Sequence, residues 1–289
     1  MAEIVIGSGG SRILVKGEDK TLQKIAGSDF AAKYIPSYSV SNNRAGISLR
    51  LTLKKGTLLF SAAYPDFSLV FPEGSLSSQD FITMIDYCLE YDRQAKGSFT
   101  IHGSACAKAD KGVLIFGPVS GLGKTSLMLE LCKNHKFFPL ADEKVVISAQ
   151  RKIVGGVSAL SLDKAAISKI LGSRRDSYDL RSGRLIPAAK DKADLSLVVL
   201  PIIAEGSRLV IEKLSAAEAD WHFYEEASRK IRGTSRRIAD FGYAPESLDT
   251  QETSLNRINA IRDISTQVEF IRIRGSLPEA AEEVNRILA

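Results

Sequence analysis

Residues 112–132 read GVLIFGPVSGLGKTSLMLELC, and the rest of the chain can be interpreted around them. The first part of this stretch, residues 113–116, is a short apolar run typical of a buried parallel strand. Glycines follow, and Gly121 and Gly123 allow the backbone to turn back tightly on itself. The stretch therefore predicts a strand, a glycine-rich turn and a helix that begins near Lys124.

The turn is predicted to bind phosphate. Amide N–H groups of such a turn converge on one point, and the positive end of the helix adds to them. Lys124 is placed to reach the β- and γ-phosphates of a nucleotide, and the Thr125 hydroxyl to ligate Mg²⁺. The pattern therefore predicts a P-loop of the Walker A type, with ATP and Mg²⁺ as cofactors. The predicted nucleotide-binding residues are Ser120, Gly121, Leu122, Gly123, Lys124, Thr125 and Ser126.

The loop departs from the strict pattern G-x-x-x-x-G-K-[ST] at one position. The first glycine of the pattern falls on Pro118, and Gly117 stands one residue early, while residues 120–125 keep the rest. The alternative is a glycine-rich connection that binds nothing. That alternative leaves the Lys-Thr pair after the last glycine unexplained, so phosphate binding is the prediction.

The composition is that of a globular protein with its own core. The chain has 289 residues, of which 44% are hydrophobic. No stretch approaches the roughly 20 uninterrupted apolar residues of a membrane span, and the first residues carry no basic-then-apolar export signal. We therefore expect a cytoplasmic protein with no membrane partner.

The net charge is mildly positive, at +5, and basic residues gather in residues 174–184 and 229–237. Such clusters favour anionic partners. No nucleic-acid motif or aromatic-interleaved basic stripe accompanies them, so a nucleic-acid partner is disfavoured. Solvated charge, an acidic protein and a phosphorylated small molecule stay open as explanations.

The first 95 residues predict a β-rich lobe that ends in a helix. Residues 47–53 alternate apolar and polar side chains, as expected of a half-buried antiparallel strand. Ser77 and Asp80 have the spacing of a helix N-terminal cap, and the apolar spacing after them predicts a helix to about Arg93. We place the second domain at residues 96–289.

An acidic pair follows the next apolar run. Residues 136–141 predict a strand that ends at Asp142 and Glu143, and residues 145–147 predict a further strand. Acidic residues at the carboxyl end of a strand in an α/β sheet can hold Mg²⁺ or orient an attacking hydroxyl. The structural alternative for this pair is a solvated turn between two strands.

The second domain is predicted to be an α/β P-loop kinase core with a mixed sheet flanked by helices. Residues 195–201 and 268–273 predict buried strands, and the first of them is a candidate neighbour of the strand before the turn. Helices are predicted at residues 163–171, at about 215–230 and after Pro278. A polar, weakly periodic loop is predicted at residues 173–194.

Three elements, in this order, resemble the HPr kinase/phosphorylase family, whose nucleotide core is related to ATP-dependent phosphoenolpyruvate carboxykinase. They are the His-Gly dipeptide at His102, the strand and loop of residues 112–125, and the Leu-Ala-Asp-Glu run that ends at Glu143. The resemblance is specific over residues 98–148. Glu143 replaces an aspartate of the family, and KIVGGV at residues 152–157 replaces a downstream glycine-rich signature, so we expect a relative that does not modify HPr itself.

The resemblance implies roles for the site residues. ATP phosphates would lie over the loop beside Lys124, and Mg²⁺ would be held by Thr125 and by Asp142 or Glu143. Asp142 would accept the proton of the acceptor hydroxyl, and His102 would orient the acceptor or the γ-phosphate. For His102 alone, a hydrogen-bonded packing role in an apolar strand is the alternative.

The expected function is a Mg²⁺/ATP-dependent kinase that phosphorylates a hydroxyl group on a protein serine or a small molecule. A nucleotide-binding regulator or ATPase without an acceptor is the alternative. A carboxykinase-like enzyme, and a binding domain whose turnover is lost through Pro118, stay open. The resemblance also implies a homo-oligomer, and the sequence does not identify the acceptor.

Overall fold

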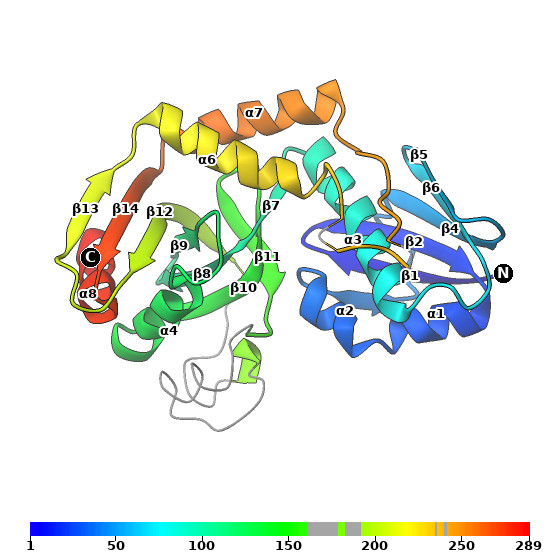
Figure 1. Cartoon of the computed structure of the whole chain (residues 1–289), viewed down its shortest axis with the longest axis horizontal. Helices are drawn as coiled ribbons and strands as arrows, with labels where there is room; N and C mark the ends of the chain where they lie inside the picture. Colours follow the sequence, from blue (N-terminus) through cyan, green and yellow to red (C-terminus); the bar gives the residue numbers. More distant parts are fainter. Residues whose placement is uncertain (161–178, 183–191, 235, 240–241) are drawn as a thin grey trace. The chain divides into compact units, whose positions relative to one another are not determined.

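The computed structural model describes most of the chain in two compact units (Figure 1). The described residues are 1–160, 179–182, 192–234, 236–239 and 242–289. The predicted helix at 163–171 and most of the predicted loop at 173–194 lie outside them. Unit 1 comprises Met1–Thr100 and Ala227–Arg257, and unit 2 comprises Ile101–Glu226 and Ile258–Ala289. We predicted residues 227–257 in the second domain, but they belong to unit 1.

Unit 1 is built on a six-stranded mixed sheet with the strand order β3-β1-β2-β4-β6-β5. Its helices α1, α2 and α3 connect or follow these strands. The bounds are β1 Ala2–Ser8, β2 Ser11–Gly17, α1 Asp19–Ala26, α2 Asp29–Tyr34, β3 Ser39–Ser41, β4 Leu49–Lys55, β5 Leu59–Ala63, β6 Asp66–Phe71 and α3 Ser78–Ala95.

Strand β4 confirms the predicted alternation but corrects the predicted direction. Leu49, Leu51 and Leu53 are buried, while the residues between them are exposed or half-buried. The strand is parallel to both of its neighbours, β2 and β6, so the antiparallel assignment was wrong. Apolar residues at every second position show that one face of a strand is covered. They do not show whether the neighbouring strands are parallel or antiparallel to it.

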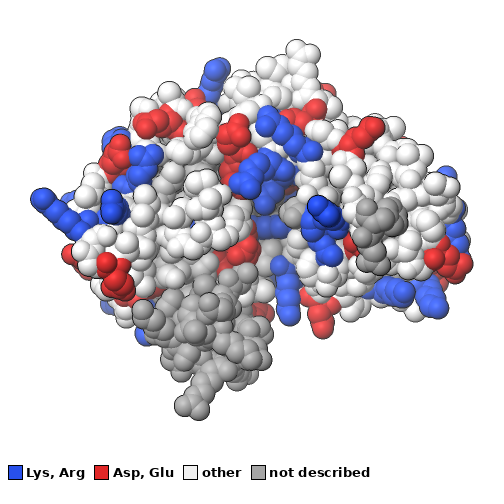
Figure 2. Space-filling model, in the orientation of Figure 1, with Lys and Arg blue, Asp and Glu red and all other residues white. Residues whose placement is uncertain are grey.

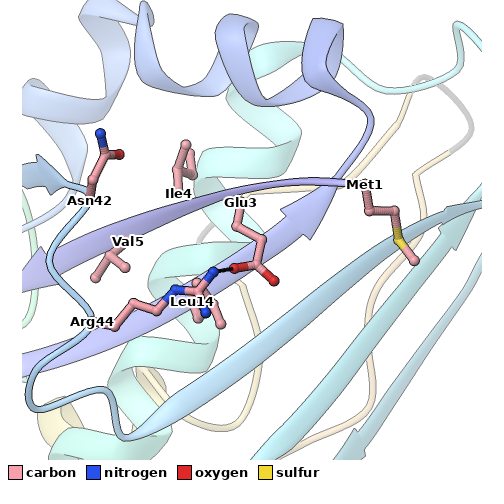
Figure 3. Close-up of a pocket in the computed structure, with 7 residues that line it drawn as sticks. All are labelled: Met1, Glu3, Ile4, Val5, Leu14, Asn42 and Arg44. Atoms are coloured by element: carbon pink, nitrogen blue, oxygen red, sulfur yellow. Dashed lines mark hydrogen bonds and ion pairs between the residues drawn. The ribbon is translucent and has the colours of Figure 1, made fainter.

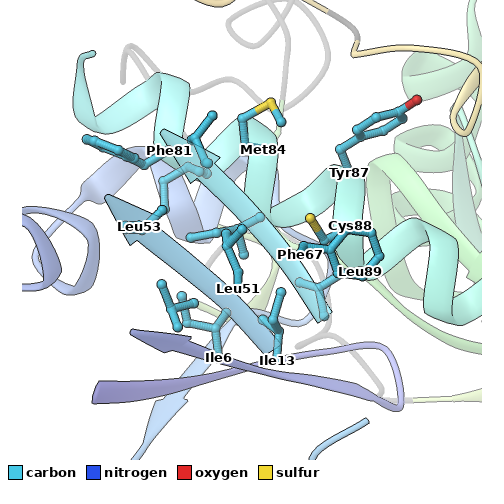
Figure 4. Close-up of a cluster of buried hydrophobic side chains, with 14 of the residues drawn as sticks. Ile6, Ile13, Leu51, Leu53, Phe67, Phe81, Met84, Tyr87, Cys88 and Leu89 are labelled. Atoms are coloured by element: carbon cyan, nitrogen blue, oxygen red, sulfur yellow. The ribbon is translucent and has the colours of Figure 1, made fainter. Parts of the chain in front are cut away.

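Helix α3 covers one face of this sheet. The helix begins where the sequence predicts. The Ser77 hydroxyl oxygen accepts a hydrogen bond from the Asp80 amide, and the Asp80 carboxylate accepts one from the Ser77 amide. Figure 4 shows the helix lying over the strands, with Phe81 near Leu53 and with Cys88 and Leu89 near Phe67, and these residues belong to one apolar cluster. This layer forms the core of unit 1.

A buried charge network lies at the end of α3. The Glu90 carboxylate accepts from Arg93 Nε at 2.8 Å, from Gln94 Nε2 at 2.7 Å and from the Thr100 hydroxyl at 2.6 Å. Arg93 also pairs with Asp86 at 3.0 Å, and its side chain is only 1% exposed. The network ties the helix to the chain that follows it, because every one of these groups would be costly to leave buried and unpaired.

We predict that Glu90→Ala destabilises the protein by about 3 kcal/mol, because the buried Arg93 loses one of its two carboxylates. Glu73→Ala is the matched control. Glu73 pairs with Lys55 at 3.1 Å, but its side chain is 79% exposed, so its loss should cost about 0–1 kcal/mol. Urea unfolding measures both values, and equal losses would contradict this account of the network.

Unit 2 contains an eight-stranded mixed sheet whose main path is β11-β10-β8-β9-β12-β14-β13. The eighth strand, β7, pairs with β10 off this path, and an additional pairing joins β11 to the start of β12. The elements that lie in this unit or reach into it are β7 Phe99–Ile101, β8 Gly103–Lys108, β9 Lys111–Phe116, α4 Lys124–Asn134, β10 Phe138–Ile147, β11 Lys152–Val157, η1 Leu180–Ser182, β12 Ala193–Ile203, β13 Val210–Lys213, α6 Ala216–Arg229, α7 Gln251–Ser265, β14 Glu269–Gly275 and α8 Leu277–Leu288. The boundary with unit 1 falls within β7, α6 and α7.

Helices cover both faces of this sheet around β9. Val113 and Ile115 pack in one cluster with apolar residues of α4 and α8. On the other face, the Phe223 ring of α6 contacts Phe116 and Phe270 at centroid distances of 5.2 and 5.0 Å. The chain is therefore α/β, with mixed sheets flanked by helices, as the sequence predicts.

Strand β9 occupies a central position in the sheet. It is antiparallel to β8 through a short hairpin and parallel to β12, which contains the predicted strand at 195–201. The predicted closing strand and the helix that follows it are β14 and α8. Among the described residues, no helix is both long and apolar enough to cross a membrane.

Candidate phosphate-binding and acid–base site

The glycine-rich loop connects β9 directly to α4, and the helix begins at Lys124 as predicted. Gly121 and Gly123 adopt φ values of 83° and 93°, in the left-handed region that favours glycine. A Cβ atom on Gly123 would lie 2.4 Å from Ile203 Cγ1, whereas one on Gly121 would meet nothing within 4 Å. Ile203 also donates its amide to the Leu122 carbonyl at 3.1 Å, so the end of β12 supports the loop.

Lys124 closes the loop on itself. Its ammonium donates to the Val119 carbonyl at 2.9 Å, and the residue is buried. Burial lowers the pKa of Lys124, and the nearby carboxylates, of which Glu143 has the largest effect, oppose that shift. The lysine ammonium is thus held at the loop, partly shielded from water and near carboxylates.

Asp142 lies behind the first turn of α4. Its Oδ1 accepts from the Thr125 hydroxyl at 2.8 Å and from the Ser104 hydroxyl of β8 at 2.6 Å. The side chain is completely buried. This burial rules out the alternative of a solvated turn. Two hydroxyl donors give the carboxylate the partners that a buried anion requires.

The acidic pair lies within β10, and this corrects the prediction that the strand ends there. Strand β10 runs from Phe138 to Ile147, so the two predicted strands are one. Its register against β11 jumps between Asp142 and Val145, which marks a β-bulge that contains Glu143 and Lys144. The prediction ended the strand at Asp142 and Glu143 because these charged residues interrupt the apolar pattern. A bulge allows the strand to continue past them.

The bulge sets the direction of Glu143. This residue has a φ of 64°, uncommon for a residue with a side chain. Gly156 faces the bulge from β11, where a Cβ atom would lie 2.1 Å from Ala141 Cβ and 2.6 Å from the Lys144 carbonyl. Only a glycine fits beneath the bulge, which gives a physical role to one of the glycines in the KIVGGV segment.

His102 pairs with Glu143. Its Nδ1 lies 2.9 Å from the Glu143 carbonyl oxygen and 3.4 Å from Glu143 Oε2. Both neighbours are acceptors, so Nδ1 carries the hydrogen, and Nε2 of the neutral ring is left as an acceptor. The side chains of His102 and Glu143 are 25% and 38% exposed, so this pair is open to solvent on one side.

The structure therefore brings the predicted residues into contact as two small groups. Lys124 and Thr125 begin α4, Thr125 bonds to Asp142, and Glu143 bonds to His102. Of the other loop residues, Ser120 and Gly121 are exposed, and Leu122 and Ser126 are half-buried. Sequence reasoning missed Ser104. Its only signal was a hydroxyl within the small apolar run of β8, two residues after His102.

The donor set suits Mg²⁺. Thr125 and Asp142 present oxygen atoms, and Mg²⁺ usually takes one or two carboxylates together with substrate phosphates instead of a cage made by protein alone. In the part of the chain that the structure describes, no group of three or more His, Cys, Asp or Glu side chains could hold a metal ion. A site that needs phosphates to complete it fits that finding.

In comparisons with known proteins, similarity was found over a short stretch of the chain. No family model matches the chain. A stretch of 72 residues is 36% identical to part of a D-aminoacyl-tRNA deacylase from Syntrophobacter fumaroxidans (strain DSM 10017 / MPOB). The match covers 24% of this chain and 48% of that protein, so the chain spans about half the length of this curated relative.

We predict that Gly123→Ala costs roughly 2–5 kcal/mol of stability, because left-handed strain and the collision with Ile203 add together. Gly121→Ala is the control. It carries a similar φ but has open space around it, so only the strain of about 1–2 kcal/mol should appear. Urea unfolding of both variants separates the two effects, and equal losses would show that Ile203 does not hold the loop.

Proposed function

We propose that this protein is a Mg²⁺/ATP-dependent kinase that transfers a phosphoryl group to a hydroxyl acceptor. The observation that carries the proposal is the 2.8 Å contact between Thr125 and Asp142 at the start of the helix that follows the glycine-rich loop. The order of His102, the loop and the acidic pair, which resembles the HPr kinase/phosphorylase family, supports it. The similarity to a deacylase covers too little of the chain to favour that activity.

The loop and Lys124 would bind the nucleotide. The positive end of α4 and the loop amides favour the phosphates, and the Lys124 ammonium would leave the Val119 carbonyl for a phosphate oxygen. Mg²⁺, held through Thr125 and Asp142, would neutralise charge on the phosphates. Positioning and charge neutralisation dominate the barrier of phosphoryl transfer, so these residues carry most of the rate.

The two carboxylates would divide the remaining work. Asp142 is buried and its Oδ1 already accepts two hydroxyl groups, which suits metal binding better than proton transfer. Glu143 is more exposed and lies against His102, so this pair would receive the acceptor proton. In the reaction, the acceptor oxygen bonds to the γ-phosphorus, the bond to the ADP oxygen breaks, and the hydroxyl proton passes to the pair.

The acceptor is a protein serine or a small hydroxyl compound. Phosphorylation of HPr is not part of the proposal, because KIVGGV stands at residues 152–157 in place of the family signature and Gly156 there packs beneath the bulge. The alternative is a nucleotide-binding regulator or ATPase that uses the same loop without an acceptor.

The test is incubation of the pure protein with γ-labelled ATP, Mg²⁺ and either a cell extract or a metabolite pool. Label on a distinct protein or metabolite supports the kinase. Release of free phosphate alone would replace the proposal with the ATPase, and absence of nucleotide binding would reject both.

Lys124→Met should weaken ATP binding by about thirtyfold or more, because the phosphates lose a buried charge partner.

The Lys124→Met variant should fold at least as stably as the parent without nucleotide, since burial lowers the pKa of Lys124 and its charge is unfavourable there. The folded parent binds fewer protons than the unfolded chain just below the ordinary lysine pKa of 10.5. Its stability relative to the variant should therefore rise as the pH approaches that value. Calorimetric titration and urea unfolding check these outcomes, and unchanged ATP affinity would refute the role of the loop.

Asp142→Asn and Glu143→Gln should separate the roles of the two carboxylates. Asp142→Asn should abolish both Mg²⁺-dependent ATP binding and label transfer. Glu143→Gln should leave ATP binding nearly unchanged and slow transfer by roughly 10²–10⁴-fold, the usual contribution of a general base. The kinase proposal fails if Asp142→Asn transfers label at the parent rate, and the division of roles fails if both variants lose ATP binding equally.

A further inference from the structure

The six-stranded sheet of unit 1 has a second face that α1 and α3 do not cover. The apolar core lies on the side of Ile13, Leu51 and Leu69, and strand alternation places the neighbouring residues on the opposite side. We call this second side the open face. From the strand registers and the contacts of Arg44, it includes Val5, Leu14, Lys16, Arg44, Lys54 and Val70.

The open face is basic. Its cations are Arg12, Lys16, Arg44, Arg50 and Lys54, and its acids are Glu3 and Asp66. Both acids are already engaged. Glu3 pairs with Lys16 at 2.9 Å and also with Arg44, and Asp66 pairs with Arg50 at 2.5 Å. Lys16, Arg44 and Arg50 share these two acids, so the face keeps three more cations than acids (five against two), and this surplus favours an anionic partner. On the wider surface drawn in Figure 2, basic and acidic side chains are interspersed.

A shallow hollow of about 470 Å³ lies at the edge of β1, where it reaches the open face, and is lined by Met1, Glu3, Ile4, Val5, Leu14, Asn42 and Arg44. Figure 3 shows Val5 and Leu14 on one side of β1 and Ile4 on the other, with Arg44 reaching Glu3. Val5 and Leu14 are buried and provide an apolar floor, while Arg44 is 69% exposed at the rim. Arg12 anchors the connection beside the hollow by donating to the Asn43 carbonyl at 2.7 Å.

A second apolar spot lies beside Lys54. The strand registers place Val70 opposite Lys54, and Leu59 opposite Val70. Leu59 is 55% exposed. The open face thus combines cations with apolar contacts at two places, and this combination is typical of protein interfaces.

We propose that the open face binds an acidic segment of a partner protein, with an apolar side chain of that segment entering the hollow over Val5 and Leu14. Carboxylates of the segment meet Arg44, Lys16 and Lys54. Nucleic acid is the less favoured anion, because no aromatic residue occupies the open face in the described strands, so bases have no stacking platform there. The acids on the face also interrupt a continuous track for phosphates.

The experiment uses fluorescence anisotropy with the full chain and a short labelled peptide, rich in glutamate, with one central leucine. Three further probes are the peptide with lysine for glutamate, the peptide with serine for leucine, and a single-stranded DNA of similar length. The test variant is Arg44→Ala/Lys54→Ala. The matched control is Lys20→Ala/Lys24→Ala, which removes two exposed lysines from α1 on the covered side.

The acidic peptide should bind the parent and the control variant alike, about tenfold more tightly than the test variant, and less tightly at raised salt. The lysine peptide should not bind, and the serine peptide should bind more weakly than the leucine peptide. The proposal is overturned if the acidic peptide does not bind, or if both variants bind it equally. Tighter, Arg44- and Lys54-dependent binding of DNA would make the open face a nucleic-acid surface instead. These outcomes do not depend on phosphoryl transfer.

Discussion

One buried carboxylate constrains the whole candidate site. Asp142 lies inside β10, shielded from water, and its Oδ1 accepts hydroxyl groups from Ser104 of β8 and Thr125 of α4. A buried anion is costly without such partners, so the three elements are restricted to an arrangement that satisfies it. Because Thr125 is the second residue of α4, the same contact fixes the helix start, and with it the glycine-rich loop, against the sheet.

The bulge in β10 gives two adjacent acids different surroundings. Asp142 stays in the strand and is buried, whereas Glu143 takes a left-handed conformation and pairs with His102 near solvent. The absence of a side chain at Gly156 makes room for this detour. Carboxylates in different environments can serve different chemistry, one with a metal and one with a proton. The proposed division of roles follows from this geometry.

The two sheets show how the burial of one or both faces of a strand is reflected in its sequence. Strand β9 is covered on both faces and reads as an unbroken apolar run, while β4 is covered on one face and alternates. Both patterns were therefore readable, as was the cap that starts α3, because each depends on neighbours within a few residues. The parallel direction of β4 was not readable, since it is set by how distant segments connect.

The strand, glycine-rich turn and helix around Lys124 could be predicted from the residues alone, because glycine spacing and apolar period act within one short segment. Three facts came from the fold and not from any local pattern: Asp142 lies in mid-strand, Ser104 and Thr125 both donate to it, and residues 227–257 belong to unit 1. The physical reason is that these facts depend on pairing between residues far apart in the chain. Such pairing is fixed by the packing of whole layers, and no local pattern encodes it.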